Sequence, residues 1–160
     1  MDETSSAINV LIVSPYEPDL ILLSNLISHS AWSYRSARTM DEARSIMTTN
    51  DLHVVLCEAD IPGGGWESVL DYTSSTRTKP ELIVLARNPD EKLWATVLNL
   101  GAWDLLPKPV HGRDLYRTVH HAFRHWSEKN RSIRKPIASE EHVRSAAASP
   151  RSTLTLAAGR

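Results

Sequence analysis

Two side chains of opposite charge each stand at the end of a short apolar segment. Glu58 directly follows Leu52–Cys57, and Lys108 follows the segment 103–106 and precedes Pro109. A carboxylate and an ammonium that meet away from bulk water form a charge-assisted hydrogen bond. The pair could therefore form a fixed ion pair or part of a site for an anionic group. Which of these is possible depends on the elements that carry the two residues.

The apolar segments alternate with segments of helical periodicity. We expect strands at about 8–13, 33–37, 52–57, 81–85 and 103–106, and helices at about 18–27, 39–48, 66–75, 89–100 and 113–126. Thr39 to Glu42 forms a capping box, and Asn88 to Glu91 combines a cap, a first-turn proline and a capping glutamate. Gly101 is expected to end the fourth helix in a left-handed conformation.

Five strands that alternate with five helices predict an α/β fold, a doubly wound (βα)5 domain with a five-stranded parallel sheet. The strands are almost continuously apolar, as expected when helices cover both faces. Ligand chemistry on such a sheet lies at the carboxyl ends of the strands. Those ends carry Ser14, Pro15, Glu58, Ala86 and Lys108.

The bulk composition indicates one soluble domain with a tail. The chain has 160 residues, of which 41% are hydrophobic and 23% are charged, and it has no long apolar run that would predict a membrane span. Its acidic, polar start does not resemble a secretory signal, and a single cysteine, Cys57, fits a cytoplasmic location. We expect residues 1–6 to be disordered, 7–129 to form the domain, and 130–160 to be a basic, Ser/Ala/Arg-rich disordered tail.

Other residues could bear chemistry, and each has a structural alternative. Glu17 and Asp19 could form a metal pair, but first-turn acids also complement a helix dipole. His121 and His125 have the spacing of two metal ligands on one helix face, but no third ligand is evident. Ser14 lacks the surroundings of a nucleophile elbow. Gly63 to Gly65 lack the spacing of a phosphate-binding loop, so they predict an ordinary loop.

Three stretches of sequence resemble the bacterial response-regulator receiver family, whose fold is flavodoxin-like. Val10 to Val13 with the following Glu17-Pro18-Asp19-Leu20 is similar to the family's first strand and helix. The stretch from Leu56 to Gly63 is similar to its third strand and acceptor loop. The most specific stretch, 98–109, resembles the Gly-Ala run into a strand that ends in Lys-Pro. The resemblance covers roughly residues 7–127.

The resemblance implies a phosphoryl-transfer site, but most of its residues are replaced. Receivers use an aspartate acceptor, an acidic pair that holds Mg²⁺, a Thr or Ser, a lysine and a mobile aromatic residue. The corresponding positions here are Glu58 for the acceptor, Ser14 and Pro15 for the acidic pair, Ala86 for the Thr/Ser, Lys108 for the lysine and Leu105 for the aromatic. Only Lys108 matches, so the chain resembles a degenerate pseudo-receiver. No Mg²⁺ or other cofactor and no enzymatic activity are expected.

Three hypotheses follow from this pattern. In the first, the chain belongs to two-component (phosphorelay) signalling and acts by protein–protein contact without phosphorylation, with Glu58 paired to Lys108 as a stand-in for a phosphorylated acceptor. In the second, it is a working receiver that uses Glu58 or Asp60. In the third, it senses a small anion beside Lys108. The partners implied are a histidine kinase or other regulators, and a homodimer is a further possibility. We expect neither a membrane nor a nucleic acid as a partner.

Overall fold

A computed structural model describes residues 7–143, with side chains over residues 7–131. The chain divides into two compact units, and the boundary in the sequence falls between Trp126 and Ser127. The first unit carries the sheet and its helices, and the second begins within the last helix. The expectations of disorder for residues 1–6 and 144–160 lie outside the described residues.

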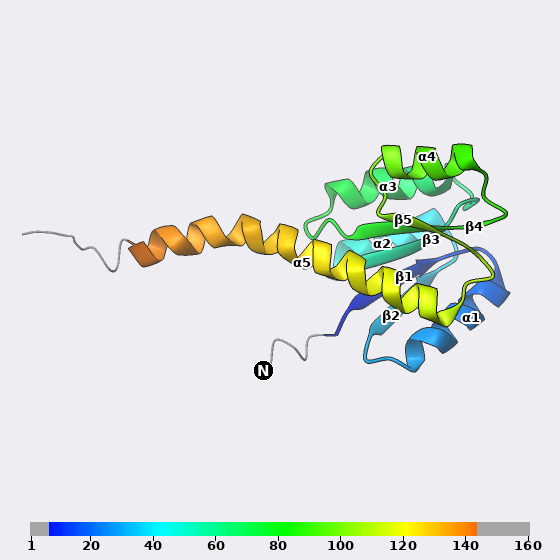
Figure 1. Cartoon of the computed structure of the whole chain (residues 1–160), viewed down its shortest axis with the longest axis horizontal. Helices are drawn as coiled ribbons and strands as arrows, with labels where there is room; N and C mark the ends of the chain where they lie inside the picture. Colours follow the sequence, from blue (N-terminus) through cyan, green and yellow to red (C-terminus); the bar gives the residue numbers. More distant parts are fainter. Residues whose placement is uncertain (1–6, 144–160) are drawn as a thin grey trace, which may run out of the picture. The chain divides into compact units, whose positions relative to one another are not determined.

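Within residues 7–143, five strands and five helices alternate in sequence. Figure 1 shows how they are arranged. Their bounds are β1 Asn9–Val13, α1 Glu17–Ser28, β2 Ser33–Ala37, α2 Met40–Thr49, β3 Val54–Glu58, α3 Gly65–Ser75, β4 Glu81–Arg87, α4 Glu91–Asn99, β5 Asp104–Lys108 and α5 Gly112–Val143. The strands form one parallel sheet in the order β2-β1-β3-β4-β5. The predicted doubly wound (βα)5 fold is confirmed.

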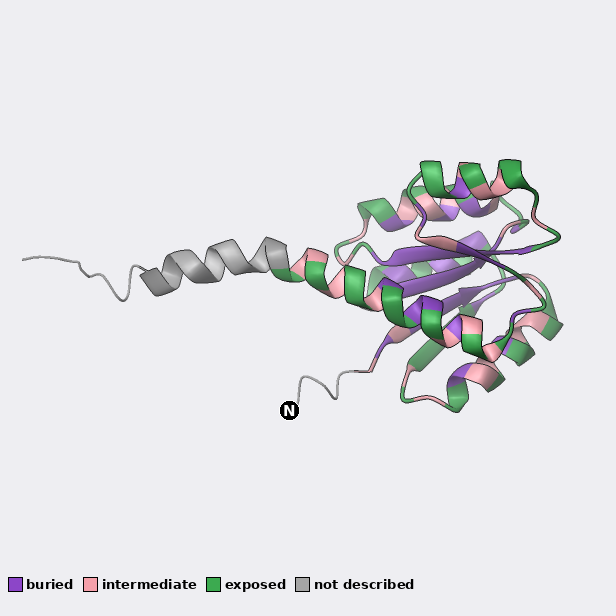
Figure 2. Ribbon diagram, viewed as in Figure 1, coloured by how far each residue is buried: buried purple, intermediate pink, exposed green. Residues whose placement is uncertain are grey.

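The sheet separates two hydrophobic cores, because successive side chains of a strand point to opposite faces. Leu11 and Val13 of β1 pack with residues of α2, α3 and α4 on one face. Val10 and Ile12 pack with residues of α1 and α5 on the other. Figure 2 shows the resulting buried centre between exposed helix surfaces. Covering both faces explains why β1, β3 and β4 are almost entirely apolar.

Side-chain caps fix where two of the helices begin. The hydroxyl of Thr39 accepts a hydrogen bond from the Glu42 amide at 3.1 Å, and the Glu42 carboxylate accepts one from the Arg38 amide at 2.7 Å. The Thr39 half of the predicted capping box of α2 is therefore confirmed, whereas Glu42 accepts from the residue before the N-cap and not from the N-cap itself. For α4 the cap is Asp90, whose carboxylate accepts from the Leu93 amide at 2.8 Å. The prediction that Asn88 opens α4 is therefore wrong: Asn88 adopts a left-handed conformation, with φ of 51°, in the preceding turn.

The last helix is longer than the sequence predicted. α5 continues to Val143, so the backbone of residues 130–143 is helical and the expected domain end at residue 129 is not a helix end. The segment lacks an apolar period, which suggested a tail. Its Arg, Lys and Glu residues favour a helix, whereas Pro136 in its interior does not.

Candidate functional site at the carboxyl edge of the sheet

The parallel register brings the ends of β1, β3, β4 and β5 to one edge of the sheet. Val13 lies beside Cys57, Glu58 beside Leu85, and Arg87 beside Lys108. The loop from β1 into α1 is only three residues long, so the first turn of α1 lies at the same edge. This edge therefore gathers Ser14, Asp19, Glu58 and Lys108 from four separate parts of the chain.

Glu58 and Lys108 meet, as the sequence predicted. The Lys108 ammonium donates to the Glu58 carboxylate over 2.5 Å, although the residues are 50 positions apart. The two side chains expose only 3% and 6% of their surfaces, so water screens this ion pair weakly. A buried pair of this kind holds both groups in one geometry, because separating them would leave a charge without a partner.

Asp19 is a second carboxylate on the same lysine. Its Oδ2 atom accepts from Lys108 Nζ at 2.8 Å, and its side chain is 15% exposed. The Ser14 hydroxyl donates to the same oxygen at 3.3 Å and accepts from the Tyr16 amide at 3.1 Å. Interpreting Asp19 only as a first-turn acid was incomplete, because it contacts a residue 89 positions away. We call Asp19, Glu58 and Lys108 the carboxylate–lysine cluster.

Tyr16 contacts the lysine of the carboxylate–lysine cluster. Its ring centroid lies 5.0 Å from Lys108 Nζ, within the range of a cation–π interaction. The residue is 45% exposed. An ion pair between Glu17 and Arg38 links the start of α1 to the loop that follows β2. The segment that carries Tyr16 and Asp19 is therefore held by two ion pairs, Glu17 with Arg38 after β2 and Asp19 with Lys108 of β5.

The surroundings of Lys108 keep it charged. Burial acts to lower its pKa, but the hydrogen bonds and charges of Asp19 and Glu58 outweigh burial and raise the pKa above the ordinary lysine value. With both carboxylates ionised, the carboxylate–lysine cluster carries a net charge of −1. Lys108 is already neutralised, so the cluster offers an incoming anion no free positive charge.

The side chains at the Thr/Ser and aromatic positions implied by the family resemblance carry neither a hydroxyl nor an aromatic ring. Ala86 and Leu105 are buried in the packing of the sheet, with 4% and 1% of their surfaces exposed. Asp60 is exposed in the turn after β3, whereas Glu58 is buried. Ser14 is fully buried and hydrogen-bonded, which fits neither a metal ligand nor a nucleophile.

The edge does not fit the magnesium ion that the family resemblance implies. Mg²⁺ prefers several oxygen ligands in octahedral geometry and retains waters. Here the two carboxylates both bind the Lys108 ammonium, which already supplies the positive charge between them. Among residues 7–131 no group of three or more His, Cys, Asp and Glu side chains has an arrangement suited to a metal. We therefore still predict that Mg²⁺ does not bind at this edge.

The remaining candidates from the sequence do not belong to the carboxylate–lysine cluster. His125 Nδ1 lies 2.6 Å from the Glu81 carboxylate, and its ring stacks on Trp103 at 4.8 Å. His121 is exposed on α5. Gly63 and Gly64 lie in the turn before α3, as predicted, whereas Gly65, which also has a positive φ, is the first residue of α3.

Comparisons with known proteins were made from sequence and from fold. Neither the family models nor the curated proteins match the sequence. Among solved structures, the chain is similar to the signal receiver domain of an HD domain-containing protein from Pseudomonas fluorescens. The match has a TM-score of 0.70 and 23% identity, and it covers 77% of this chain and 99% of that one.

Two further solved receiver domains were studied in assemblies. The NtrC4 receiver domain dimer, activated with beryllofluoride, matches with a TM-score of 0.68 and 21% identity, covering 74% of this chain and 98% of that one. A receiver domain from Saccharomyces cerevisiae, crystallised with a histidine phosphotransfer protein, matches with a TM-score of 0.64 and 20% identity, covering 71% and 86%.

These matches agree with the single sheet of five parallel strands and its five helices in the described part of the chain. Within residues 7–143, no helix is long and apolar enough to cross a lipid bilayer. The chain has the (βα)5 fold of response-regulator receiver domains.

Proposed function

We propose that this chain is a receiver-like protein of two-component signal transduction that works by contact with other signalling proteins and accepts no phosphoryl group. The observation that carries the proposal is the engagement of Glu58 by Lys108 in a buried ion pair. A phosphoacceptor must present a free carboxylate oxygen to its donor. Here that position is 3% exposed and already bound to the lysine.

The carboxylate–lysine cluster supports the proposal that the side chains at the carboxyl edge of the sheet keep one fixed arrangement. In a phosphorylated receiver the conserved lysine would pair with a phosphoryl oxygen, as the family resemblance implies. In this chain Glu58 reaches one methylene further than aspartate and places its own oxygen on the lysine. Asp19 then occupies the remaining side of the ammonium. The proposed consequence is a single surface state that partners recognise without a phosphorylation switch.

The partner class follows from the solved neighbours. One is crystallised with a histidine phosphotransfer protein and another is a dimer. We infer that the partner is a histidine kinase, a phosphotransfer protein or another regulator. A second copy of the chain is a further candidate. We also infer that the protein works in the cytoplasm.

The other two hypotheses have less support. A phosphoacceptor that uses Asp60 would act from an exposed turn, without the contact to Lys108 that Glu58 makes. A small anion beside Lys108 would meet two carboxylates there, with net negative charge. Three cavities among the described residues, with volumes of about 320, 560 and 320 Å³, are not lined by Lys108.

Acetyl phosphate tests the proposal. The full chain is incubated with acetyl phosphate and Mg²⁺, and its intact mass is compared with that of a phosphorylatable receiver treated in parallel. We expect no phosphoryl adduct on this chain. A stoichiometric adduct that hydroxylamine removes would overturn the proposal, and the variants Glu58→Gln and Asp60→Asn would then identify the acceptor.

A further inference from the structure

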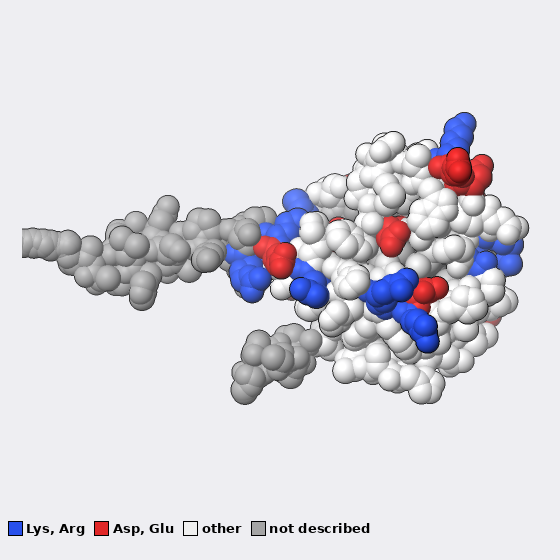
Figure 3. Space-filling model, in the orientation of Figure 1, with Lys and Arg blue, Asp and Glu red and all other residues white. Residues whose placement is uncertain are grey.

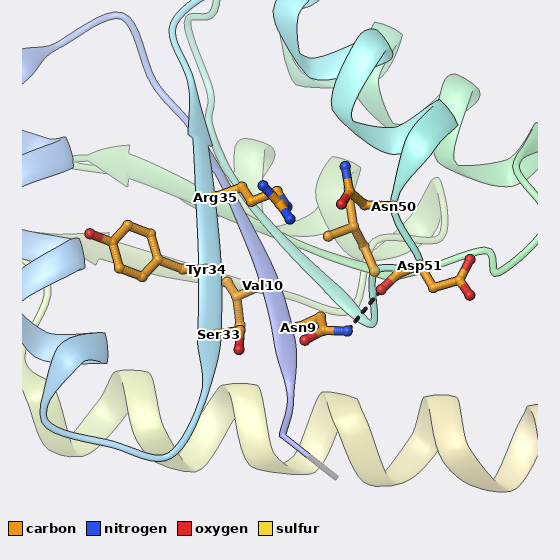
Figure 4. A pocket seen from close by; sticks show the side chains of 8 residues that line it. Asn9, Val10, Ser33, Tyr34, Arg35, Asn50 and Asp51 are labelled. Atoms are coloured by element: carbon orange, nitrogen blue, oxygen red, sulfur yellow. Dashed lines mark hydrogen bonds between the residues drawn. The ribbon is translucent and has the colours of Figure 1, made fainter.

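A cavity of about 320 Å³ opens at the other edge of the sheet, where the strands begin (Figure 4). Residues from the starts of β1 and β2 and from the α2–β3 loop line it, among them Asn9, Ser33, Arg35, Asn50, Asp51 and Leu52. Its volume lies at the small end of the range for small-molecule sites, about 300–1,000 Å³. Open α/β sheets usually bind ligands at the carboxyl edge, so that rule does not explain this cavity.

Arg35 supplies an uncompensated positive charge to the cavity. It lies beside Leu11 in the sheet, on the face that α2 covers, and Figure 4 shows its guanidinium extending from β2 toward the α2–β3 loop. The residue is exposed, and it forms no ion pair with any residue that the structure describes. Three other arginines of this part of the chain, Arg38, Arg44 and Arg77, each have a carboxylate partner.

The opposite wall carries polar groups held in place by the fold. The Asn9 side-chain amide donates to the Asp51 carbonyl at 3.0 Å, which joins β1 to the loop. Asn50 donates its amide hydrogens to Ile46 and Thr49, both at 3.0 Å, so its side-chain carbonyl oxygen accepts no hydrogen bond from the described residues. The Ser33 hydroxyl also lines the cavity. These groups can hydrogen-bond hydroxyl or amide groups of a ligand.

The local charge favours an anion. Asp51 is the acidic residue among those that line the cavity, and its carboxylate forms an ion pair with Arg77. Arg35, Asp51 and Arg77 together carry a net charge of +1. A planar guanidinium can bind a carboxylate or phosphate through two parallel hydrogen bonds. A neighbouring cavity of about 560 Å³ shares Asn50 and Asp51, but its own arginine, Arg77, is already paired.

We propose that this cavity binds a small molecule with one carboxylate or phosphate group and a polar, hydroxyl-bearing body. Arg35 anchors the anionic group, and the Ser33 hydroxyl and the Asn50 carbonyl oxygen bind the body. The site is separate from the carboxylate–lysine cluster at the other edge of the sheet, where the net charge is negative. It does not depend on the proposed signalling function, because none of its residues belongs to that cluster.

The test is an amide NMR titration of the full chain with glycerol 3-phosphate, glycerate and inorganic phosphate, with glycerol as the uncharged control. The first two probes share a body and differ in the anionic group. We expect at least one of them to give saturable shifts at Ser33, Arg35 and Asp51, and glycerol to give none. The variant Arg35→Gln should weaken binding about tenfold or more, since a charge-assisted hydrogen bond contributes roughly 1.5–3 kcal/mol.

The matched control is Arg87→Gln, which removes another exposed arginine without a described ion pair, at the end of β4. It should leave binding unchanged. Both variants lie on the surface, and a thermal melt confirms that each folds. Saturable binding by neither glycerol 3-phosphate nor glycerate would overturn the proposal. Undiminished binding in Arg35→Gln would also overturn the proposal. Loss of binding in Arg87→Gln would overturn it as well, because it would show that the ligand binds at the carboxyl edge.

Discussion

At the scale of single residues, the central feature is one lysine held by two carboxylates. Burying three charged groups costs solvation free energy, and their mutual attraction offsets that cost only in good geometry. Lys108 contacts Glu58 at 2.5 Å and Asp19 at 2.8 Å, and Ser14 adds a further hydrogen bond to Asp19. Removing one member should therefore cost more than removing an exposed ion pair, which contributes about 0–1 kcal/mol.

A double-mutant cycle measures this coupling. Glu58→Gln, Lys108→Met and the double variant are compared by urea unfolding. Glu58→Gln leaves Lys108 with Asp19 as its one carboxylate partner, and Lys108→Met leaves two carboxylates without a counter-charge. The double change leaves only the Asp19 carboxylate, so the coupling energy between Glu58 and Lys108 should exceed about 0.5 kcal/mol. The exposed pair Arg44–Asp41 serves as a control and should couple more weakly. Additive free energies for Glu58 and Lys108 would mean that the contact has no energetic effect.

The sequence predicted this site in part. Glu58 and Lys108 each end a strand, and parallel strand ends share an edge, so their meeting followed from the topology. Asp19 was missed as a partner because helical periodicity places it in the first turn of α1 without giving the direction of its side chain. The short β1–α1 loop was the available signal. The amino-edge cavity beside Arg35 was not predicted, since it depends on how the α2–β3 loop lies against β2.

At the scale of elements, an aromatic cluster attaches α5 to the sheet. The His53 ring, just before β3, lies 5.0 Å from Phe123 and 4.4 Å from Trp126. The Trp126 indole donates to the Thr78 carbonyl at 2.7 Å, and the Asn9 amide donates to His53 Nδ1 at 3.0 Å. Protonation of Nδ1 would remove that acceptor, so the packing requires neutral His53.

The stability of the domain should therefore fall in mild acid. Burial lowers the pKa of His53, and the charge of Asp51 opposes this only in part. Below the ordinary histidine pKa of about 6.5 the unfolded chain binds a proton that folded His53 resists, so stability is lost as the pH falls through that value. Urea unfolding at pH 7.5 and pH 5.5 should show a smaller loss for His53→Gln than for the wild type.

His111→Gln, a change at an exposed histidine, provides the comparison for this experiment. Its loss of stability between the two pH values should match that of the wild type. If His53→Gln also matches the wild type, protonation of His53 has no part in the acid response.

Element positions followed from the sequence more closely than element ends. Apolar runs located β1, β3, β4 and β5, whereas β2 is polar and only its last residue, Ala37, is buried. The start of α4 was placed too early, since both Asn88 and Asp90 are good caps and only the turn geometry selects Asp90. The end of α5 was placed too early because its last residues lack the apolar period of a packed helix.

At the scale of the whole molecule, the chain has an acidic body and a basic end. Residues 1–130 contain 12 Lys/Arg and 17 Asp/Glu, whereas residues 131–160 contain 6 and 2. Figure 3 shows the charges of the described residues on one face. The buried hydrophobic residues of both cores lie between Ile8 and Ala122, so the stability of the fold should come from the first compact unit.

Deleting residues 131–160 tests this distribution of stability. We expect the melting temperature to change by less than about 2 °C, which corresponds to under roughly 1 kcal/mol at this chain length. Differential scanning calorimetry of the two chains measures the change directly. A fall of several degrees would show that the deleted segment stabilises the domain.

In the proposed function, the carboxyl edge of the sheet is already complete without a phosphoryl group. Beryllofluoride, the activating group in the solved NtrC4 dimer, tests it most directly when added with Mg²⁺ to the full chain and followed by amide NMR. We predict no saturable shifts at Glu58, Ala59, Ala86 or Lys108, with Mg²⁺ alone or with both reagents. Saturable shifts at these amides, abolished by Glu58→Gln, would contradict the account by showing that the edge still accepts a phosphoryl-like group.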